Sequence, residues 1–113
     1  MTRDMELARK ILMKIEEKSS PSATPLHVDG YDMETVAQHC KLLYEYGLVG
    51  SYNPQYAANS LYTFSAGPLT WEGYDYLDKI RNENTWTKVK TWIKEKGLPF
   101  TIEVIRDALI ALI

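Results

Sequence analysis

A helix that leads directly into a β-hairpin decides the fold class of this 113-residue sequence. Asp32 is well placed to cap a helix over residues 33–46, and Gly47 stands where helices often end in a left-handed residue. A buried stripe on this helix is expected from the apolar residues at helical spacing, which are Met33, Val36, Ala37, Cys40, Leu43 and Tyr44. Gly47 therefore marks the point where helical periodicity gives way to strands.

The hairpin is predicted from two β-prone segments, residues 48–52 and 61–64. The breaker Asn53-Pro54 falls between them and predicts a connecting loop at about residues 53–60. Gly67-Pro68 is expected to end the second strand. Because side chains alternate between the faces of a strand, one pair of residues is expected on one face and a second pair on the other, namely Tyr62 and Phe64 against Leu61 and Thr63.

The chain begins with a predicted helix over residues 3–18. Its apolar stripe is expected from Met5, Ala8, Ile11, Leu12 and Ile15. Residues 19–25 contain two prolines, which favour an irregular linker. A short strand over residues 26–28 is a further possibility, followed by the turn signal Asp29-Gly30.

Three more helices are predicted after the hairpin, over about 70–82, over 85–96 and from Thr101 onward, each capped by the threonine at its start. The first is expected to bury Trp71, Tyr74, Leu77 and Ile80, and the second Trp86, Val89, Trp92 and Ile93. Gly73 would allow another backbone to approach the first of these helices closely.

This order of elements predicts an α+β fold with a winged-helix-like arrangement. The arrangement consists of a helix, a short strand, a helix and a β-hairpin wing, with two additional C-terminal helices. Residues 1–113 are expected to form a single domain in which residues 85–113 are a helical extension. Hydrophobic residues make up 45% and charged residues 25%, which is ordinary for a soluble globular protein.

Two segments are similar to small bacterial winged-helix repressors of the ArsR and MarR kinds. Residues 36–49 resemble their recognition-helix segment, with the shared elements Val36, His39, Leu43 and Gly47-Leu48-Val49. The run Leu69-Thr70-Trp71-Glu72-Gly73, followed by Leu77, resembles the segment after the wing in MarR-like proteins.

A broader resemblance covers nearly the whole chain. The start, Arg3-Asp4-Met5-x-Leu7-x-Arg9-Lys10-Ile11-Leu12, resembles the opening of the bacterial and prophage family called domain of unknown function 2513. The stretch from Leu69 to Arg81, with Trp86 and Lys88 after it, also resembles that family, and the related YjcQ-like family has the same layout. The resemblance implies a winged-helix-like fold in a cytoplasmic bacterial or phage protein, and it implies no established activity.

DNA binding is the alternative that the fold analogy offers. Residues expected on the outward face of helix 33–46 could enter a major groove, namely Thr35, Gln38, His39 and Lys41. Phosphate contacts need Lys and Arg, yet no basic residue lies between Lys41 and Lys79. That interval holds Glu45, Glu72, Asp75 and Asp78 instead. The charges therefore disfavour a DNA-binding regulator.

Basic residues are concentrated in residues 79–96, where six of them stand against Glu83 and Glu95. This segment is either a surface for an anionic partner or the solvated face of a helix whose other side is apolar. We favour the solvated face.

Two surfaces are candidates for binding an unidentified protein partner. Tyr52, Tyr56 and Tyr62 lie in or beside the wing, and tyrosine suits protein interfaces; the alternative is that these rings cover the core. The last helix is apolar nearly all round and includes Ile110 and Ile113. It either packs in a homodimer or lies deep in its own domain.

No catalytic constellation is recognisable, so no enzyme, cofactor or metal is expected. Cys40 is the only cysteine and falls on an apolar stripe, which predicts a core residue. The possible metal ligands lack zinc-site spacing; they are His27, Asp29, His39 and Cys40. The charged start does not resemble a signal peptide, and no run is apolar enough to span a membrane. A cytoplasmic location is expected.

Overall fold

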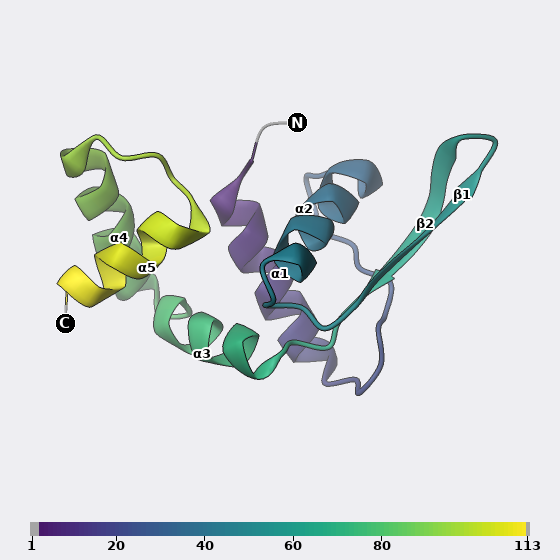
Figure 1. The fold of residues 1–113 in the computed structure, drawn as a ribbon, viewed down its shortest axis with the longest axis horizontal. Helices are drawn as coiled ribbons and strands as arrows, with labels where there is room; N and C mark the ends of the chain where they lie inside the picture. Colours follow the sequence, from purple (N-terminus) through teal and green to yellow (C-terminus); the bar gives the residue numbers. More distant parts are fainter. Residues whose placement is uncertain (1–2, 113) are drawn as a thin grey trace. The chain divides into compact units, whose positions relative to one another are not determined.

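The computed structural model describes residues 3–112, which form five helices and one β-hairpin. In chain order these are α1 (Met5–Lys18), α2 (Met33–Glu45), β1 (Tyr52–Ala57), β2 (Ser60–Ala66), α3 (Trp71–Ile80), α4 (Glu83–Lys96) and α5 (Ile102–Ala111) (Figure 1). This order confirms the α+β class and is compatible with a winged-helix-like arrangement. The chain divides into two compact units, Met1–Leu77 and Asp78–Ile113, called here the N-terminal and the C-terminal unit.

The core of the N-terminal unit lies where α1 packs against α2 and α2 contacts both strands. Asp4 caps α1 by accepting hydrogen bonds from the backbone N–H groups of Glu6 and Leu7. The helix thus begins two residues later than the sequence pattern predicts. Buried apolar side chains from α1, α2 and β2 fill this core, including Leu7, Ile11, Leu12, Val36, Cys40, Leu43, Phe64 and Ala66.

The linker between α1 and α2 forms no strand, so the predicted short strand over residues 26–28 is wrong. Backbone pairing is confined to one bridge, in which Thr24 and Ala66 exchange both hydrogen bonds. The side chains of Leu26 and Val28 are buried, but the backbone of this segment is not paired with a strand.

Helix α2 buries a different set of residues from the predicted stripe. The cap at Asp32 and the left-handed Gly47 are confirmed. Met33 and Tyr44, at the two ends of the expected stripe, are exposed. His39 is buried instead, which corrects its expected place on the outward face.

The hairpin is longer and its turn tighter than predicted. The first strand predicted over residues 48–52 is wrong except at Tyr52, because Val49 pairs in an isolated bridge with Leu69 and β1 begins only at Tyr52. The expected loop over residues 53–60 is mostly strand, and the turn consists of Ala58 and Asn59, both with positive φ as a twist-matched two-residue turn requires. Pro54 is tolerated in β1 because β1 has only one neighbouring strand, β2.

Helix α3 lies against the segment that leaves α2. A Cβ added to Gly73 would lie 2.0 Å from the Leu48 carbonyl oxygen, which confirms the predicted close approach. Thr70 caps the helix by accepting the Gly73 N–H, and its own hydroxyl donates to the Gly47 carbonyl. Trp71 lies on the far side and is exposed, so its predicted burial is wrong.

The C-terminal unit is a pair of packed helices, α4 and α5. Asn82, rather than the predicted Thr85, caps α4, while the predicted cap of α5 by Thr101 is confirmed. The rings of Trp86 and Phe100 lie 5.6 Å apart. Small and apolar residues complete this second core, namely Val89, Ile93, Ile102, Ile105 and Ala108.

Candidate functional site

The two faces of the wing differ in polarity. The strand register pairs Tyr52 with Ala66 and Pro54 with Phe64, so these four share one face. Alternation along β1 adds Tyr56 to that face. The opposite face carries polar residues at most of its paired positions, namely Asn53, Gln55, Thr63 and Ser65, with the pair Ala57 and Ser60 next to the turn.

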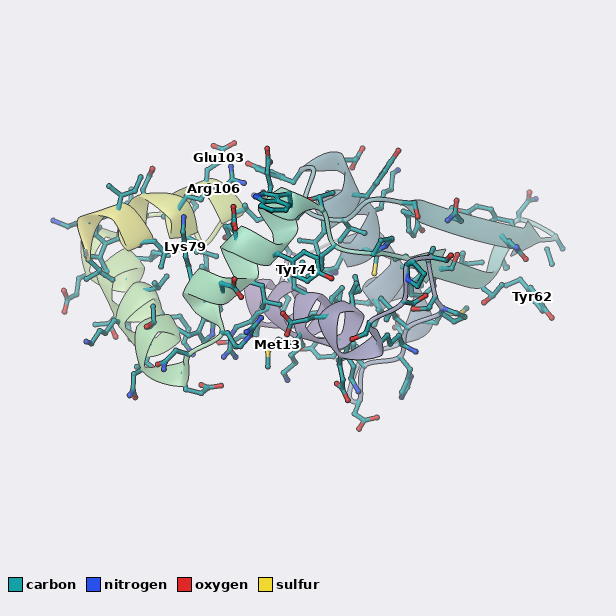
Figure 2. The ribbon with its side chains drawn as sticks, turned by 90° about the horizontal axis from the view of Figure 1, so that it is seen from below. Met13, Tyr62, Tyr74, Lys79, Glu103 and Arg106 are labelled. Carbon is teal, nitrogen blue, oxygen red and sulfur yellow. The ribbon has the colours of Figure 1, made fainter. Side chains whose placement is uncertain are left out.

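The aromatic face of the wing is covered at its base and open at its tip. Phe64 is buried, and its ring lies 6.2 Å from that of Tyr52, which is half-buried. Tyr56 is 66% exposed and Tyr62 70% exposed. The register shifts beside Tyr56, leaving Tyr62 without a directly paired residue on β1. Figure 2 shows Tyr62 projecting near the turn, so two of the three predicted tyrosines form an exposed wing tip.

The wing also lacks charge, since no Asp, Glu, Lys or Arg lies between Glu45 and Glu72. Edge strands that must resist pairing with other chains usually carry such charges. Among the described residues, pairing beyond the hairpin itself reaches β2 only at Ala66. The tip is therefore an uncharged ribbon with exposed aromatic side chains and unpaired backbone edges.

The predicted DNA-contacting residues of α2 do not form one exposed set. Gln38 and Lys41 are exposed, Thr35 is half-buried, and His39 is buried. Only the Gln38 amide and the Lys41 ammonium group are therefore left to contact bases, on a helix that also exposes Glu34 and Glu45.

His39 has a structural role that fixes its tautomer. Its Nε2 accepts the backbone N–H of Asp4 at 2.9 Å. Its Nδ1 lies 2.8 Å from the Thr35 carbonyl oxygen, which can only accept, so Nδ1 carries the hydrogen. A neutral imidazole satisfies both bonds, and His39 thereby ties α2 to the start of α1.

Tyr31 joins the same cluster from the linker. Its hydroxyl donates to a carboxylate oxygen of Asp4 at 3.0 Å, and this hydrogen bond is the main cause that raises the tyrosine pKa above 10.0. At the start of α2, the backbone N–H of Thr35 donates to Asp32 and lowers the pKa of that carboxyl below 3.8. These groups are engaged in capping and tethering, which accounts for their polarity without a ligand.

The two units differ in charge. The N-terminal unit has six basic and ten acidic residues, whereas the C-terminal unit has seven basic and five acidic residues. Lys90 and Lys96 lie over the rings of Trp86 and Trp92, each within 6 Å. The unit that holds α2 and the wing is thus the acidic one.

The last helix was predicted to offer an interface that includes Ile110 and Ile113. Ile110 is 70% exposed and Leu112 is also exposed, whereas Ile102, Ile105 and Ala108 face the core of the C-terminal unit. Ile113 lies outside the described residues. Two apolar side chains at this end are therefore exposed, Ile110 on α5 and Leu112 just after it, while the rest of the outward face of α5 carries the charged residues Glu103, Arg106 and Asp107.

The residues that could act as nucleophiles or metal ligands are buried or far from one another. Burial raises the pKa of the Cys40 thiol to about 12, which removes its nucleophilic form near neutral pH. Among residues 3–112, no three His, Cys, Asp or Glu side chains lie together as a metal site would require. In the same residues, no helix has both the length and the apolar character needed to cross a bilayer.

Trp71 and Tyr74 are exposed residues that the sequence analysis assigned to the core. A signal for the exposure of Trp71 was available, because a helix turns by about 100° per residue and Gly73 was expected to face another backbone. Trp71, two residues away, then falls nearly on the opposite side. Beside Tyr74 lies a groove of about 480 Å³, lined also by Pro68, Leu69 and residues of the α1 end.

Comparisons with known proteins identify the family of the chain. An uncharacterized protein of Haemophilus influenzae is 38% identical over 109 residues, which cover 95% of this chain and 91% of the relative. No solved structure matches the chain. The family model described as "Hypothetical protein (DUF2513)" matches residues 2–99. The match extends over both units and most of the sequence, and the chain therefore belongs to the DUF2513 family.

Proposed function

We propose that this chain is a non-catalytic protein-interaction module whose main contact surface is the wing tip, defined by Tyr56 and Tyr62. The exposure of both rings at the end of an uncharged hairpin carries this proposal. Tyrosine offers a large apolar area with a polar tip at a small cost in side-chain entropy, and it is enriched at protein interfaces. The partner is a protein not yet identified.

The polarity of the hairpin supports the same function. Its polar face can stay in water while its aromatic face covers a partner's apolar surface. The free backbone edges of the tip can add hydrogen bonds to an extended segment of that partner. We propose that this interaction takes place in the bacterial cytoplasm, whether the gene belongs to the bacterium itself or to a prophage. A bacterial relative supports this proposal.

DNA binding is the less favoured function. The order of elements is compatible with a winged helix, and Gln38 and Lys41 are exposed. Against it, the N-terminal unit carries a net formal charge of −4. Such a surface repels phosphates, and α2 offers Lys41 alone as a cation.

A second contact surface is proposed on α5, where a copy of the same chain would cover Ile110 and Leu112. Exposed apolar side chains at the end of a helix can be covered by the same side chains of a second copy related by a two-fold axis. Sedimentation of the chain at micromolar concentration as a dimer, and of the Ile110→Glu variant as a monomer, is the expected result. A monomeric wild-type chain would remove this part of the proposal.

The experiment that tests the main proposal compares three baits in nuclease-treated lysate of the native host. The baits are the wild-type chain, the double variant Tyr56→Ala/Tyr62→Ala, and the control Gln55→Ala on the polar face of β1. We expect the wild type and the control to retain the same protein and the double variant to lose it. Equal retention by all three baits would contradict a contact surface at the wing tip.

A duplex titration tests the alternative directly. At low ionic strength we expect no saturable binding of duplex DNA by the wild-type chain. Micromolar or tighter binding that weakens steeply with salt, and that Gln38→Ala or Lys41→Ala reduces, would favour the DNA-binding function instead.

A further inference from the structure

The face of α3 that points away from the core carries aromatic and acidic side chains together. This α3 patch consists of Trp71, Glu72, Tyr74 and Asp75, all exposed. Trp71 is 85% exposed, the largest value among the exposed large hydrophobic residues of the described chain. Tyr74, one turn further along, is exposed on the same side. A tryptophan left in water forgoes the burial of a large apolar area, so its position calls for an explanation.

Tyr74 extends the patch into the adjoining groove of about 480 Å³. Pro21, Pro68 and Leu69 supply apolar walls, and Glu16 supplies a carboxylate. Ser19 and Pro21 are themselves exposed, so the groove is open at this rim. An open apolar groove beside a protruding ring fits an extended peptide better than a small enclosed ligand.

The patch is held on a rigid support. The backbone N–H of Thr70 donates to the Leu48 carbonyl at 3.1 Å, and the Thr70 hydroxyl donates to the Gly47 carbonyl. Gly73 lies in direct contact with the backbone of Leu48. Because the first turn of α3 is fixed, the backbone that carries Trp71 and Tyr74 is already ordered, which reduces the ordering that binding would require.

The charge around the two rings determines which sign of charge a bound segment would carry. Glu72 and Asp75 flank the aromatic residues on α3, and Glu16 lines the groove. The positive end of the helix dipole contributes only about half a unit charge, so three carboxylates outweigh it. Lys14 and Lys18 are the basic residues within two positions of a residue that lines the groove. A cationic side chain would be attracted by the carboxylates and by the face of the indole ring.

We propose that the α3 patch and its groove bind an extended segment of another protein that carries arginine or lysine. A guanidinium or ammonium group lies on the Trp71 ring beside Glu72, and the rest of the segment follows Tyr74 into the groove. This surface is separate from the wing tip, so the proposal goes beyond the proposed function and does not depend on it.

Peptide display on the intact chain provides the test. Random peptides are selected on the wild-type chain with counter-selection on Trp71→Ala, and the enriched peptide is then synthesised together with a copy in which glutamine replaces its basic residues. We expect enriched sequences to be rich in arginine or lysine. Enrichment of acidic or purely apolar sequences, or no enrichment that depends on Trp71, would overturn the proposal.

Binding of the synthetic peptide is measured by fluorescence anisotropy. Trp71→Ala should weaken binding about tenfold or more, as expected for an anchor residue at an interface, and Trp71→Phe should restore part of it. Glu72→Gln/Asp75→Asn and the glutamine peptide should each bind more weakly, and added salt should do the same. Tyr62→Ala should bind like the wild type. Wild-type affinity in Trp71→Ala, with an unchanged circular dichroism spectrum, would contradict the proposal.

Discussion

The base and the tip of the wing are made of the same kinds of residue, yet only the base is covered. At the base, Phe64 is buried and packs against Tyr52. At the tip, Tyr56 and Tyr62 are exposed to solvent, and Figure 2 shows Tyr62 projecting from the hairpin. The tip of the hairpin extends beyond α2, which packs against its base (Figure 1). Alternation along a strand therefore predicts which side chains share a face, but it does not predict whether another element covers that face. Base residues should therefore control stability and tip residues should control binding.

Phe64→Ala is expected to have the largest effect on stability. Truncating a buried phenylalanine removes apolar burial and leaves a cavity, which costs about 3–5 kcal/mol. Urea unfolding followed by circular dichroism would measure the loss. A loss below about 1 kcal/mol would mean that the base of the wing is not part of the core.

Ser51→Ala should have an intermediate effect at the same end of the wing. The Ser51 hydroxyl donates to the Gly67 carbonyl at 2.7 Å and helps to close the base of the hairpin. Losing one such hydrogen bond costs about 0.5–1.5 kcal/mol. The same unfolding experiment measures it, with Ser60→Ala at the exposed tip as the matched control, for which no comparable loss is expected.

The ionisation of Tyr52 should report the partial burial of the base. Burial is the main cause that raises its pKa above 10.0, with smaller contributions from Tyr56 and Cys40. A raised folded-state pKa means that this contribution to stability is complete below pH 10 and is lost as pH rises through the folded-state value. Unfolding free energy should therefore fall above pH 10, and Tyr52→Phe should make that fall smaller. An identical alkaline decline in both proteins would contradict the burial of this ring.

Tyr56→Ala/Tyr62→Ala should have the smallest effect on stability. Exposed side chains with few contacts usually change the free energy of unfolding by no more than about 0.5 kcal/mol. Urea unfolding of the double variant tests this, and a loss of 2 kcal/mol or more, on the scale that core truncations reach, would show that the rings stabilise the fold.

Local rules predicted the backbone of this protein better than its surfaces. Asp32, Gly47, Gly73 and Thr101 do what their positions indicate, because a cap, a left-handed residue or a close approach depends on a few neighbouring atoms. The second strand was predicted in place, but the first was predicted over residues 48–52 and shares only Tyr52 with β1. The two-residue turn at Ala58-Asn59 lacks the glycine that usually marks such turns, so it has no local signal in the sequence.

Burial depends on which elements meet, and here the sequence patterns failed at particular residues. His39 is buried because Asp4, thirty-five positions away in the chain, donates to its ring. Trp71 is exposed because Gly73 turns the other side of α3 toward Leu48. For His39 the deciding partner is distant in sequence, so periodicity along a single helix could not assign its face. For Trp71 the expected close approach at Gly73 was a local signal that the apolar pattern of α3 outweighed.

The claim that the wing tip is a contact surface is tested most directly by photo-cross-linking in the native host. A photoreactive p-benzoylphenylalanine replaces Tyr62 at the tip in one variant and Gln55, on the polar face of the same hairpin, in another. If the wing tip is the contact surface, we expect a discrete protein adduct from position 62 and none from position 55. Equal labelling from both positions, or no adduct from position 62, would contradict it.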